Sequence, residues 1–226
     1  MSGGRVAAVV LAAGGSARLG RPKQLVVHAG EPLVRRAARA ARLAGADPVL
    51  VVLGAHADAV APALAGLDGV RPLLHAGWGA GMAGSLLAGL EAVRAADPAP
   101  DAVLVTLADQ PLVDAAALGR LIAAWPGAHA LAAAAYGDPP GAVLGVPAVF
   151  GRAHLGALLD ALRAVDGDAG AGRWLRAHRA MVTPVPLPEA AFDLDTPADL
   201  DRLAALDGPG TPGGPGEVTS STEAPR

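Results

Sequence analysis

The sequence predicts a single three-layer α/β domain, in which a mostly parallel sheet is covered by helices on both faces. Apolar runs short enough for strands alternate with longer stretches in which apolar residues recur at helical spacing. The apolar runs are nearly continuous, as strands buried on both faces require. A chain of 226 residues is long enough for one such domain with a sizeable core.

The first half of the chain has the most regular pattern. It begins with a strand at Val6–Leu11, and after a long loop a helix follows at Leu33–Leu43. Further strands are expected at Pro48–Leu53, Arg71–Leu74 and Ala102–Leu107, and further helices at Ala57–Leu64, Met82–Ala95 and Asp114–Ala124. Asp114 can cap the last of these helices. Because ligands bind beyond the carboxyl ends of parallel strands, we expect the functional site in the loops after the strands.

The second half is less regular. Strands are expected at Ala130–Ala135, Val143–Phe150, Met181–Val185 and Phe192–Asp193, and helices at Arg152–Ala164, Arg173–His178 and Pro197–Leu206. Thr196 stands where it can cap the last helix, with Asp199 in its first turn. Residues 208–226 are rich in Pro, Gly, Ser and Thr, so we expect a folded domain over 1–207 and a disordered tail after it.

Composition excludes several classes of protein. A net charge of −3 gives no basic field for nucleic acid, and the absence of cysteine rules out disulfides and thiolate metal sites. No apolar run approaches the length of a membrane span, and none reads as a signal peptide. We therefore expect a cytoplasmic protein. Arg35, Arg39 and Arg42 fall along one side of a helix, where a solvated face is the favoured interpretation.

The loop after the first strand is the most informative segment. It reads GGSARLGRPK over residues 14–23, and combines bare backbone N–H groups with the spaced cations Arg18 and Lys23. It is not a P-loop, because Arg21-Pro22 follows Gly20 where Lys-Ser/Thr is required, and Ser16 breaks the dinucleotide pattern. We expect a different phosphate-binding loop. The alternative is an ordinary turn with surface cations.

Carboxylates follow at two later points. Asp109 comes just after an apolar strand, so it and the glycine loop can converge at one edge of the sheet and hold Mg²⁺. Asp193 and Asp195 are two residues apart on an extended segment and can face the same side, so one of them could complete the metal site. The alternatives are that Asp109 caps a turn and that the later acids stabilise a helix N-terminus.

A glycine-rich segment precedes the helix at Met82–Ala95. Residues 79–84 formally match G-x-G-x-x-G, but the strand before them is brief and no acid follows at the distance a dinucleotide site requires. Ser85 and the start of the helix suit polar binding, whereas a tight packing turn is the alternative. Trp78 could stack on a ring or pack in the core.

These segments resemble the signature of the MobA-like NTP transferase family, and most closely its molybdopterin cytidylyltransferase branch. Residues 11–23 have the form L-A-A-G-x-S-x-R-x-G-x-P-K. Four further segments match in order, GMAGS at 81–85, LADQP at 107–111, PAVF at 147–150 and DLDTPADL at 193–200. The resemblance covers about residues 5–206 and implies a Rossmann-like domain of the nucleotide-diphospho-sugar transferase type.

The resemblance implies a Mg²⁺-dependent enzyme that transfers a nucleotidyl group from an NTP to a phosphorylated acceptor and releases pyrophosphate. The implied nucleotide-binding residues are Leu11, Ala12, Ala13, Gly14, Gly15, Arg18, Lys23, Gly81 and Ser85. Arg18, Lys23 and Asp109 are implied in catalysis, and Asp109 and Asp195 as metal ligands. CTP is favoured because Ala13 stands where the guanylyl branch usually has glycine. Molybdopterin is the implied acceptor, and a molybdenum hydroxylase the implied client.

Two departures from the family concern the acceptor side. His75 stands where members often have asparagine, and residues 139–147 read PPGAVLGVP in place of a basic-His-Pro segment. Guanylyl and sugar-phosphate nucleotidyltransferases therefore remain as alternatives. So does a non-catalytic maturation protein of the same fold.

Overall fold

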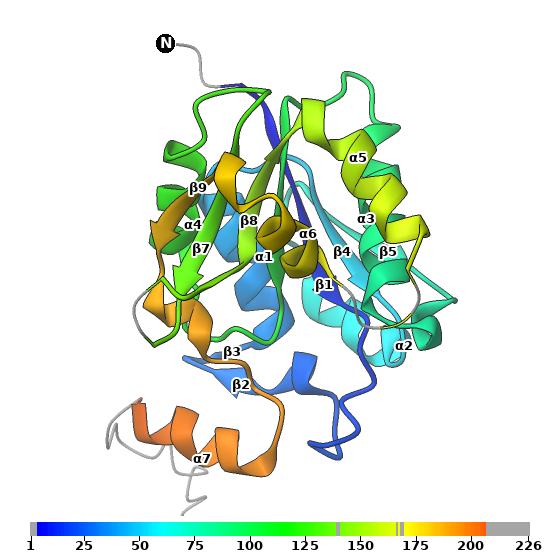
Figure 1. Ribbon diagram of the computed structural model, residues 1–226. Coiled ribbons are helices and arrows are strands. Elements are labelled where there is room, and N and C mark those ends of the chain that lie inside the picture. Colours follow the sequence, from blue (N-terminus) through cyan, green and yellow to red (C-terminus); the bar gives the residue numbers. More distant parts are fainter. Residues whose placement is uncertain (1–3, 139–140, 166, 168–169, 207–226) are drawn as a thin grey trace, which may run out of the picture.

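The computed structural model describes residues 4–138, 141–165, 167 and 170–206, and its centre is a seven-stranded sheet (Figure 1). The strands, in sheet order, are β5 (Val70–Leu74), β4 (Val49–Leu53), β1 (Val6–Ala12), β6 (Ala102–Leu107), β8 (Val143–Gly151), β7 (Leu131–Tyr136) and β9 (Val182–Pro186). All neighbours are parallel except β8, which is antiparallel to both β6 and β7. The predicted fold class is confirmed. The predicted tail at 208–226 lies outside the described residues, so the domain boundary stays a prediction.

Helices cover both faces of this sheet. The helices of the described residues are α1 (Leu33–Leu43), α2 (Ala57–Val60), α3 (Met82–Arg94), α4 (Ala115–Ala123), α5 (Arg152–Arg163), α6 (Ala171–Ala177) and α7 (Pro197–Leu206), of which α7 lies outside the sheet layers. α1 and α4 pack on one face, and α3, α5 and α6 on the other (Figure 1). Residues of β1 alternate between the two cores: Ala8 and Val10 belong to the first, and Ala7 and Val9 to the second. This burial on both faces explains the continuous apolar run.

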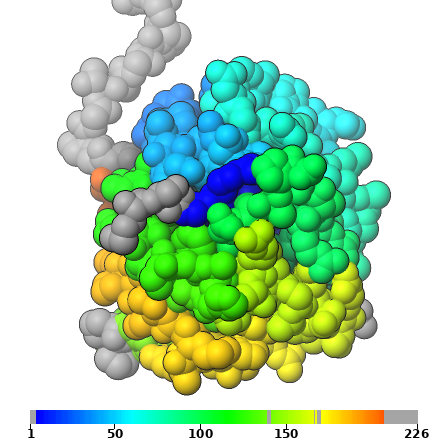
Figure 2. Space-filling model, turned by 90° about the horizontal axis from the view of Figure 1, so that it is seen from above, coloured from blue at the N-terminus to red at the C-terminus, as the bar shows by residue number. Residues whose placement is uncertain are grey.

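The strand directions bring several loops to one edge. Because β7 and β6 both oppose β8, β7 runs parallel to β6 and β1, and the carboxyl ends of all three lie at the lower edge in Figure 1. Seen from the opposite edge, the dark-blue start of β1 lies between light-blue and green parts of the chain, as the order β4-β1-β6 requires (Figure 2). The glycine loop after β1, Asp109 after β6 and Tyr136 at the end of β7 therefore share one side of the domain.

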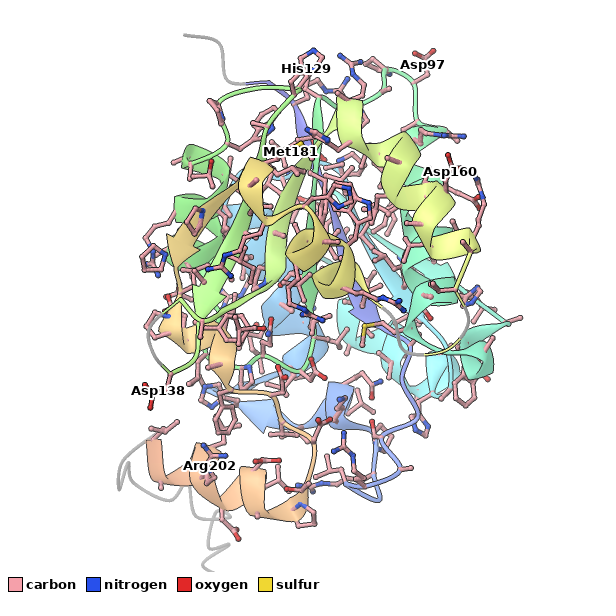
Figure 3. All side chains as sticks on the ribbon, in the orientation of Figure 1. Asp97, His129, Asp138, Asp160, Met181 and Arg202 are labelled. Atoms are coloured by element: carbon pink, nitrogen blue, oxygen red, sulfur yellow. The ribbon has the colours of Figure 1, made fainter. Side chains whose placement is uncertain are left out.

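A small outer unit lies beyond this edge, at the bottom of Figure 3. It contains the 3₁₀ turn η1 (Lys23–Leu25), the hairpin strands β2 (Val27–His28) and β3 (Glu31–Pro32), and α7. A separate apolar cluster holds it together, formed by Leu19, Val26, Leu33, Phe192, Leu194 and Leu203. The packing ties the loop after β1 to the C-terminal helix, far away in the sequence.

Three local predictions need correction. Phe192–Asp193 is not a strand, because nothing pairs with it along a ladder; Phe192 and Leu194 are buried in the outer cluster, which explains the alternating pattern. The helix expected at Ala57–Leu64 is α2 followed by the 3₁₀ turn η2 (Ala61–Leu64). Thr196 donates its hydroxyl to the Asp199 carboxylate at 2.8 Å instead of accepting from the helix, so Asp199 satisfies this helix start.

Other expectations agree with the structure. Asp114 accepts a hydrogen bond from the Ala117 N–H at 2.8 Å and so caps α4 as predicted. Arg39 is exposed and pairs with Glu31, as a solvated face predicts, whereas Arg35 and Arg42 are half-buried and donate to backbone carbonyl groups of other segments. Within the described residues, each helix is too short or too polar to traverse a bilayer.

Candidate active site

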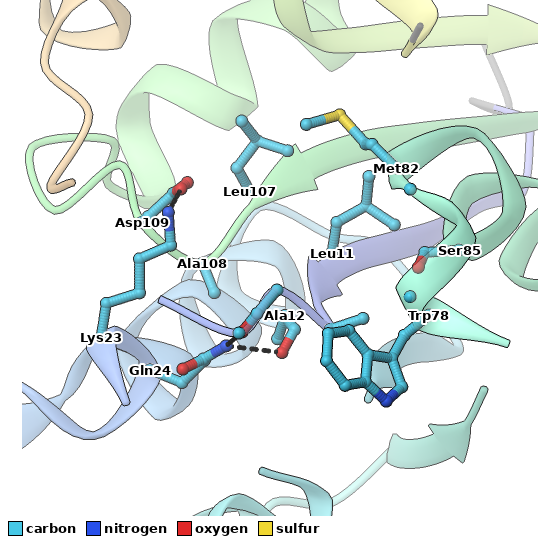
Figure 4. Close-up of a pocket in the computed structure, with 15 residues that line it drawn as sticks. Leu11, Ala12, Lys23, Gln24, Trp78, Met82, Ser85, Leu107, Ala108 and Asp109 are labelled. Carbon is cyan, nitrogen blue, oxygen red and sulfur yellow. Dashed lines mark hydrogen bonds and ion pairs between the residues drawn. The ribbon is translucent and has the colours of Figure 1, made fainter. Parts of the chain in front are cut away.

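A cavity of about 300 Å³ opens at the carboxyl edge of β1 and β6 (Figure 4). Its lining residues are Leu11, Ala12, Ala13, Gly14, Gly15, Lys23, Gln24, Trp78, Gly79, Gly81, Met82, Ser85, Leu107, Ala108 and Asp109. Every predicted nucleotide-binding residue except Arg18 is among them. Segments from three separate parts of the sequence thus meet around one space.

The side chain of Gln24 supports the backbone of the glycine loop through hydrogen bonds. The side chain of Gln24 is 2% exposed, and its Nε2 donates to the carbonyl oxygens of Ala12 at 2.9 Å and Gly14 at 2.8 Å (Figure 4). Gln24 was not predicted from the sequence. No local pattern marks it, because a buried amide can satisfy these carbonyl groups only once the loop has folded around it.

Ser16 connects the glycine loop to the backbone of Lys23. Its backbone has a φ of 55°, a left-handed conformation that is uncommon outside glycine. In this position the Ser16 hydroxyl oxygen accepts from the Lys23 N–H at 3.1 Å. On the other side, the ring nitrogen Nε2 of His56 lies 3.1 Å from the Gly15 carbonyl oxygen. The loop is therefore shaped by its own hydrogen bonds before any ligand is present.

Lys23 joins the two predicted metal ligands. Its Nζ lies 2.5 Å from Oδ2 of Asp109 and 2.8 Å from Oδ1 of Asp195. The other oxygen of Asp195, Oδ2, accepts from Nη2 of Arg18 at 2.9 Å. The structure thus brings together all four of the charged residues predicted for catalysis and metal binding. Arg18 lies outside the cavity lining and reaches the site through Asp195.

The two carboxylates keep Lys23 charged. Burial alone would lower the pKa of Lys23, but the nearby charges and hydrogen bonds of Asp109 and Asp195 outweigh burial and raise the pKa above its ordinary value. An ammonium held in this way can move to another anion without losing its proton. It is therefore suited to binding phosphate.

Asp109 has an oxygen left over for a ligand. Oδ1 of Asp109 is buried and has no hydrogen-bond partner among the described residues, while Oδ2 is bound to Lys23. Mg²⁺ is usually bound by one or two carboxylates, with water and substrate phosphates completing its shell. No cluster of three or more potential metal ligands occurs in the described part of the chain. The pair Asp109 and Asp195 fits a metal that arrives together with phosphate better than a metal enclosed by protein alone.

Asp193 lies near Asp109 and Asp195, and the pKa of its carboxyl group is raised. Although part of it faces solvent, burial, the charge of Asp109 and that of Asp195 raise its pKa to about 6, against opposing effects of Gln110 and Lys23. The carboxylate of Asp195, and not that of Asp193, contacts Lys23.

The far wall of the cavity comes from the start of α3. Gly81 has a φ of 113°, and a Cβ there would lie 2.4 Å from the backbone of Gly167, so only glycine fits. Trp78 is 39% exposed and lines the cavity beside Gly15, which argues against the core-packing interpretation. Ser85 is 4% exposed and lines the same wall (Figure 4).

The glycine loop, Lys23 and the carboxylates of Asp109 and Asp195 therefore converge at the edge where Rossmann-like sheets bind nucleotides. The fold and the site define the class of protein as a nucleotidyltransferase. The MobA-like NTP transferase domain matches residues 8–182, and the chain belongs to this family.

Individual relatives cover nearly the whole chain. The sequence is 36% identical over 207 residues to nicotine blue oxidoreductase of Paenarthrobacter nicotinovorans, a match that spans 88% of this chain and 96% of that protein. Rv0371c from Mycobacterium tuberculosis H37Rv is 33% identical, with a TM-score of 0.70 over 90% of this chain and 98% of that one. A further structure of Rv0371c is a complex with manganese. A nucleotidyl transferase from Methanothermobacter thermautotroptrophicus is 25% identical, with a TM-score of 0.73 over 89% of this chain and 97% of that one.

Proposed function

We propose that this protein is a Mg²⁺-dependent nucleotidyltransferase that uses CTP in preference to other NTPs. Its acceptor would be molybdopterin or another small molecule with a phosphate group, and pyrophosphate would be released. The observation that supports this most directly is the position of Lys23 between Asp109 and Asp195 at the cavity wall. A mobile cation next to two carboxylates is suited to a substrate that brings both phosphate and metal.

The chemistry needs no nucleophile from the protein. An oxygen of the acceptor phosphate attacks the α-phosphorus of the NTP, the bond from that phosphorus to the bridging oxygen breaks, and pyrophosphate leaves. Because the acceptor is already an anion, catalysis consists of positioning and of neutralising charge. The glycine loop would bind the phosphates through its N–H groups, with Lys23 and Arg18 offsetting their charge. Mg²⁺ bound to Asp109 and Asp195 would neutralise charge on the α-phosphate and the leaving group.

The proposed dependence on a divalent metal is supported by one relative whose structure is a complex with manganese. The manganese complex of Rv0371c is 32% identical to this chain and has a TM-score of 0.69. Manganese binds the same hard oxygen ligands as magnesium. The unpartnered Oδ1 of Asp109 is the matching observation in this chain.

The base would bind in the cavity beside the glycine loop and Trp78. The preference for CTP rests on Ala13, which is 6% exposed in the cavity lining. Trp78 presents its ring to the same space beside Gly15 and can stack on a base.

The acceptor would approach along the remaining part of the same edge, over β8 and β7. Tyr136 ends β7 here, and its hydroxyl lies 2.5 Å from the place that a Cβ of Gly145 would occupy. The charges of Asp193 and Arg176 both reach Tyr136, and burial raises its pKa, so its hydroxyl stays a donor. We propose that Tyr136 and Arg176 face the acceptor.

A redox function is the second candidate, because one relative is called an oxidoreductase. Gly79 and Gly81 line the cavity, but Gly79 lies within η3 (Trp78–Ala80) and Gly81 after it, so residues 75–78 separate both from the end of β5 at Leu74. A dinucleotide fingerprint instead follows its strand directly. The geometry therefore favours nucleotidyl transfer.

Release of pyrophosphate tests the proposal. The protein would be incubated with Mg²⁺ and CTP, GTP, UTP or ATP, with and without molybdopterin or a sugar phosphate. We expect release with CTP and molybdopterin, and a loss of turnover in Lys23→Ala protein that still unfolds cooperatively. Oxidation of NADH or NADPH without pyrophosphate release would favour the redox candidate, and release with another pair would correct the substrates.

A further inference from the structure

The chain has a single lysine. Its basic side chains number 18 when Lys and Arg are counted together, and Lys23 is the one lysine among them. Elsewhere in the described residues arginine forms ion pairs, for example Arg120 with Glu189 and Arg152 with Asp101. The one ammonium group on a side chain is therefore placed between Asp109 and Asp195.

An ammonium fits between two carboxylates more readily than a guanidinium does, although both carry one positive charge. Its charge is compact, and its three donors can be shared by separate carboxylates, whereas the planar guanidinium is matched to one carboxylate at a time. Nζ of Lys23 lies 2.5 Å from Asp109 and 2.8 Å from Asp195, so it contacts both acids as a small cation would.

These contacts are sheltered from water. The side chains of Lys23 and Asp109 are each 17% exposed, and that of Asp195 is 31% exposed. Salt and water screen such pairs less than surface pairs. Arg18, by contrast, is 71% exposed where it meets Asp195, and its pair should contribute little.

We propose that Lys23 is the resident counter-cation of the ligand-free protein, which occupies Asp109 and Asp195 and so keeps free divalent metal out of the site. The inference rests on the proposed nucleotidyl transfer for its second half: the phosphates of an NTP draw Lys23 away and leave both carboxylates available. Lys23 then exchanges one set of anions for another. The two acids are never left without a cation.

This exchange couples the two ligands. A divalent cation that binds alone must break both contacts of Lys23 and leave the ammonium near a second positive charge. When an NTP is bound, Lys23 pairs with its phosphates, so the free-energy cost of separating Lys23 from the two carboxylates is smaller. Nucleotide and metal should therefore each raise the affinity for the other, as linkage requires.

Binding of Mn²⁺ without nucleotide tests the first half directly. Titrations followed by electron paramagnetic resonance would compare the wild type with Lys23→Met, Lys23→Arg and Arg39→Met. We expect Lys23→Met to bind Mn²⁺ at least about tenfold more tightly than the wild type, because removal of one nearby charge is worth more than this at moderate burial. Arg39→Met removes a charge from a pair with Glu31 and should bind as the wild type does.

Lys23→Arg keeps the positive charge and should bind Mn²⁺ as weakly as the wild type does. It therefore distinguishes exclusion of the metal by charge from an effect of the substitution on the fold. Thermal unfolding gives a second readout, because Mn²⁺ should raise the melting temperature of Lys23→Met and leave that of the wild type nearly unchanged. Equal Mn²⁺ affinity in Lys23→Met and the wild type, with both folded, would overturn the proposal. So would tight Mn²⁺ binding by Lys23→Arg.

The second half is measured with a non-hydrolysable CTP analogue. The analogue should tighten Mn²⁺ binding to the wild type much more than to Lys23→Met, and an equal effect on both would refute the exchange. None of these measurements depends on turnover. A protein that releases no pyrophosphate with any NTP would refute the proposed function, while the metal titrations alone decide the role of Lys23.

Discussion

Replacement of Gln24 by methionine should destabilise the glycine loop without opening a cavity. Methionine has a similar length and volume but cannot donate the two hydrogen bonds from Nε2 to the carbonyl groups of Ala12 and Gly14. The side chain is 2% exposed, so water cannot take its place without rearrangement. The perturbation therefore acts on the backbone that shapes the cavity.

Loss of the Gln24 donor has a different free-energy cost at each of the two carbonyl groups. Ala12 is buried, and an unsatisfied acceptor there costs about 1–3 kcal/mol. Gly14 is exposed, so its carbonyl oxygen can turn to water and only the net value of one hydrogen bond, about 1 kcal/mol, is lost. We expect Gln24→Met to lower the free energy of unfolding by about 2–4 kcal/mol, and to weaken binding of CTP because the loop is no longer fixed.

Urea unfolding and calorimetric binding of CTP measure the two effects separately. Gln24→Glu is the matched control, since it keeps the shape but places an acceptor against two carbonyl oxygens and should be more harmful than methionine. If Gln24→Met unfolds within about 0.5 kcal/mol of the wild type, an effect no larger than that of an ordinary surface substitution, and binds CTP equally well, the assigned role of Gln24 is wrong.

Three further changes test other parts of the site. Asp109→Asn removes charge but little volume, and should reduce kcat for pyrophosphate release by about a hundredfold or more while the protein stays folded; a small effect would exclude Asp109 from metal binding. The pKa of Asp193 is raised from 3.8 to about 6 in the folded protein, so its ionisation costs stability as pH rises through that interval. Asp193→Asn should therefore be more stable than the wild type above this interval, and the difference should vanish below it in unfolding curves; an advantage that is independent of pH would contradict this. Trp78→Ala should raise KM for CTP by about tenfold with little loss of stability, and Leu74→Ala, at an exposed apolar position outside the cavity, is the control.

The sequence predicts the fold best where strands are buried on both faces. β1, β4 and β6 were placed to within a residue at each end because such strands are apolar throughout. The direction of β8 could not be predicted, since an apolar run reads the same for parallel and antiparallel pairing. The hairpin of β2 and β3 was missed because two residues per strand are too few to show a period.

The site was predictable where residues follow strands directly. The glycine loop and Asp109 fall at strand ends, so the topology alone brings them together. The contact between Lys23 and Asp195 spans 172 positions, and no local pattern specifies it. Gln24 could not be recognised from the sequence because its role depends on the path of the loop that it supports.

The outer apolar cluster can form only after the C-terminal part of the domain has been synthesised. Phe192, Leu194 and Leu203 hold the segment with Asp195 against Leu19 and Val26 of the first loop. A ribosome makes every strand of the sheet before it makes α7. The nascent chain can therefore form its sheet and glycine loop early, while the second acid arrives only when the last helix docks. A product terminated before α7 would keep the cavity and the ion pair of Lys23 with Asp109, but would lack the helix that packs the segment of Asp195 against the first loop.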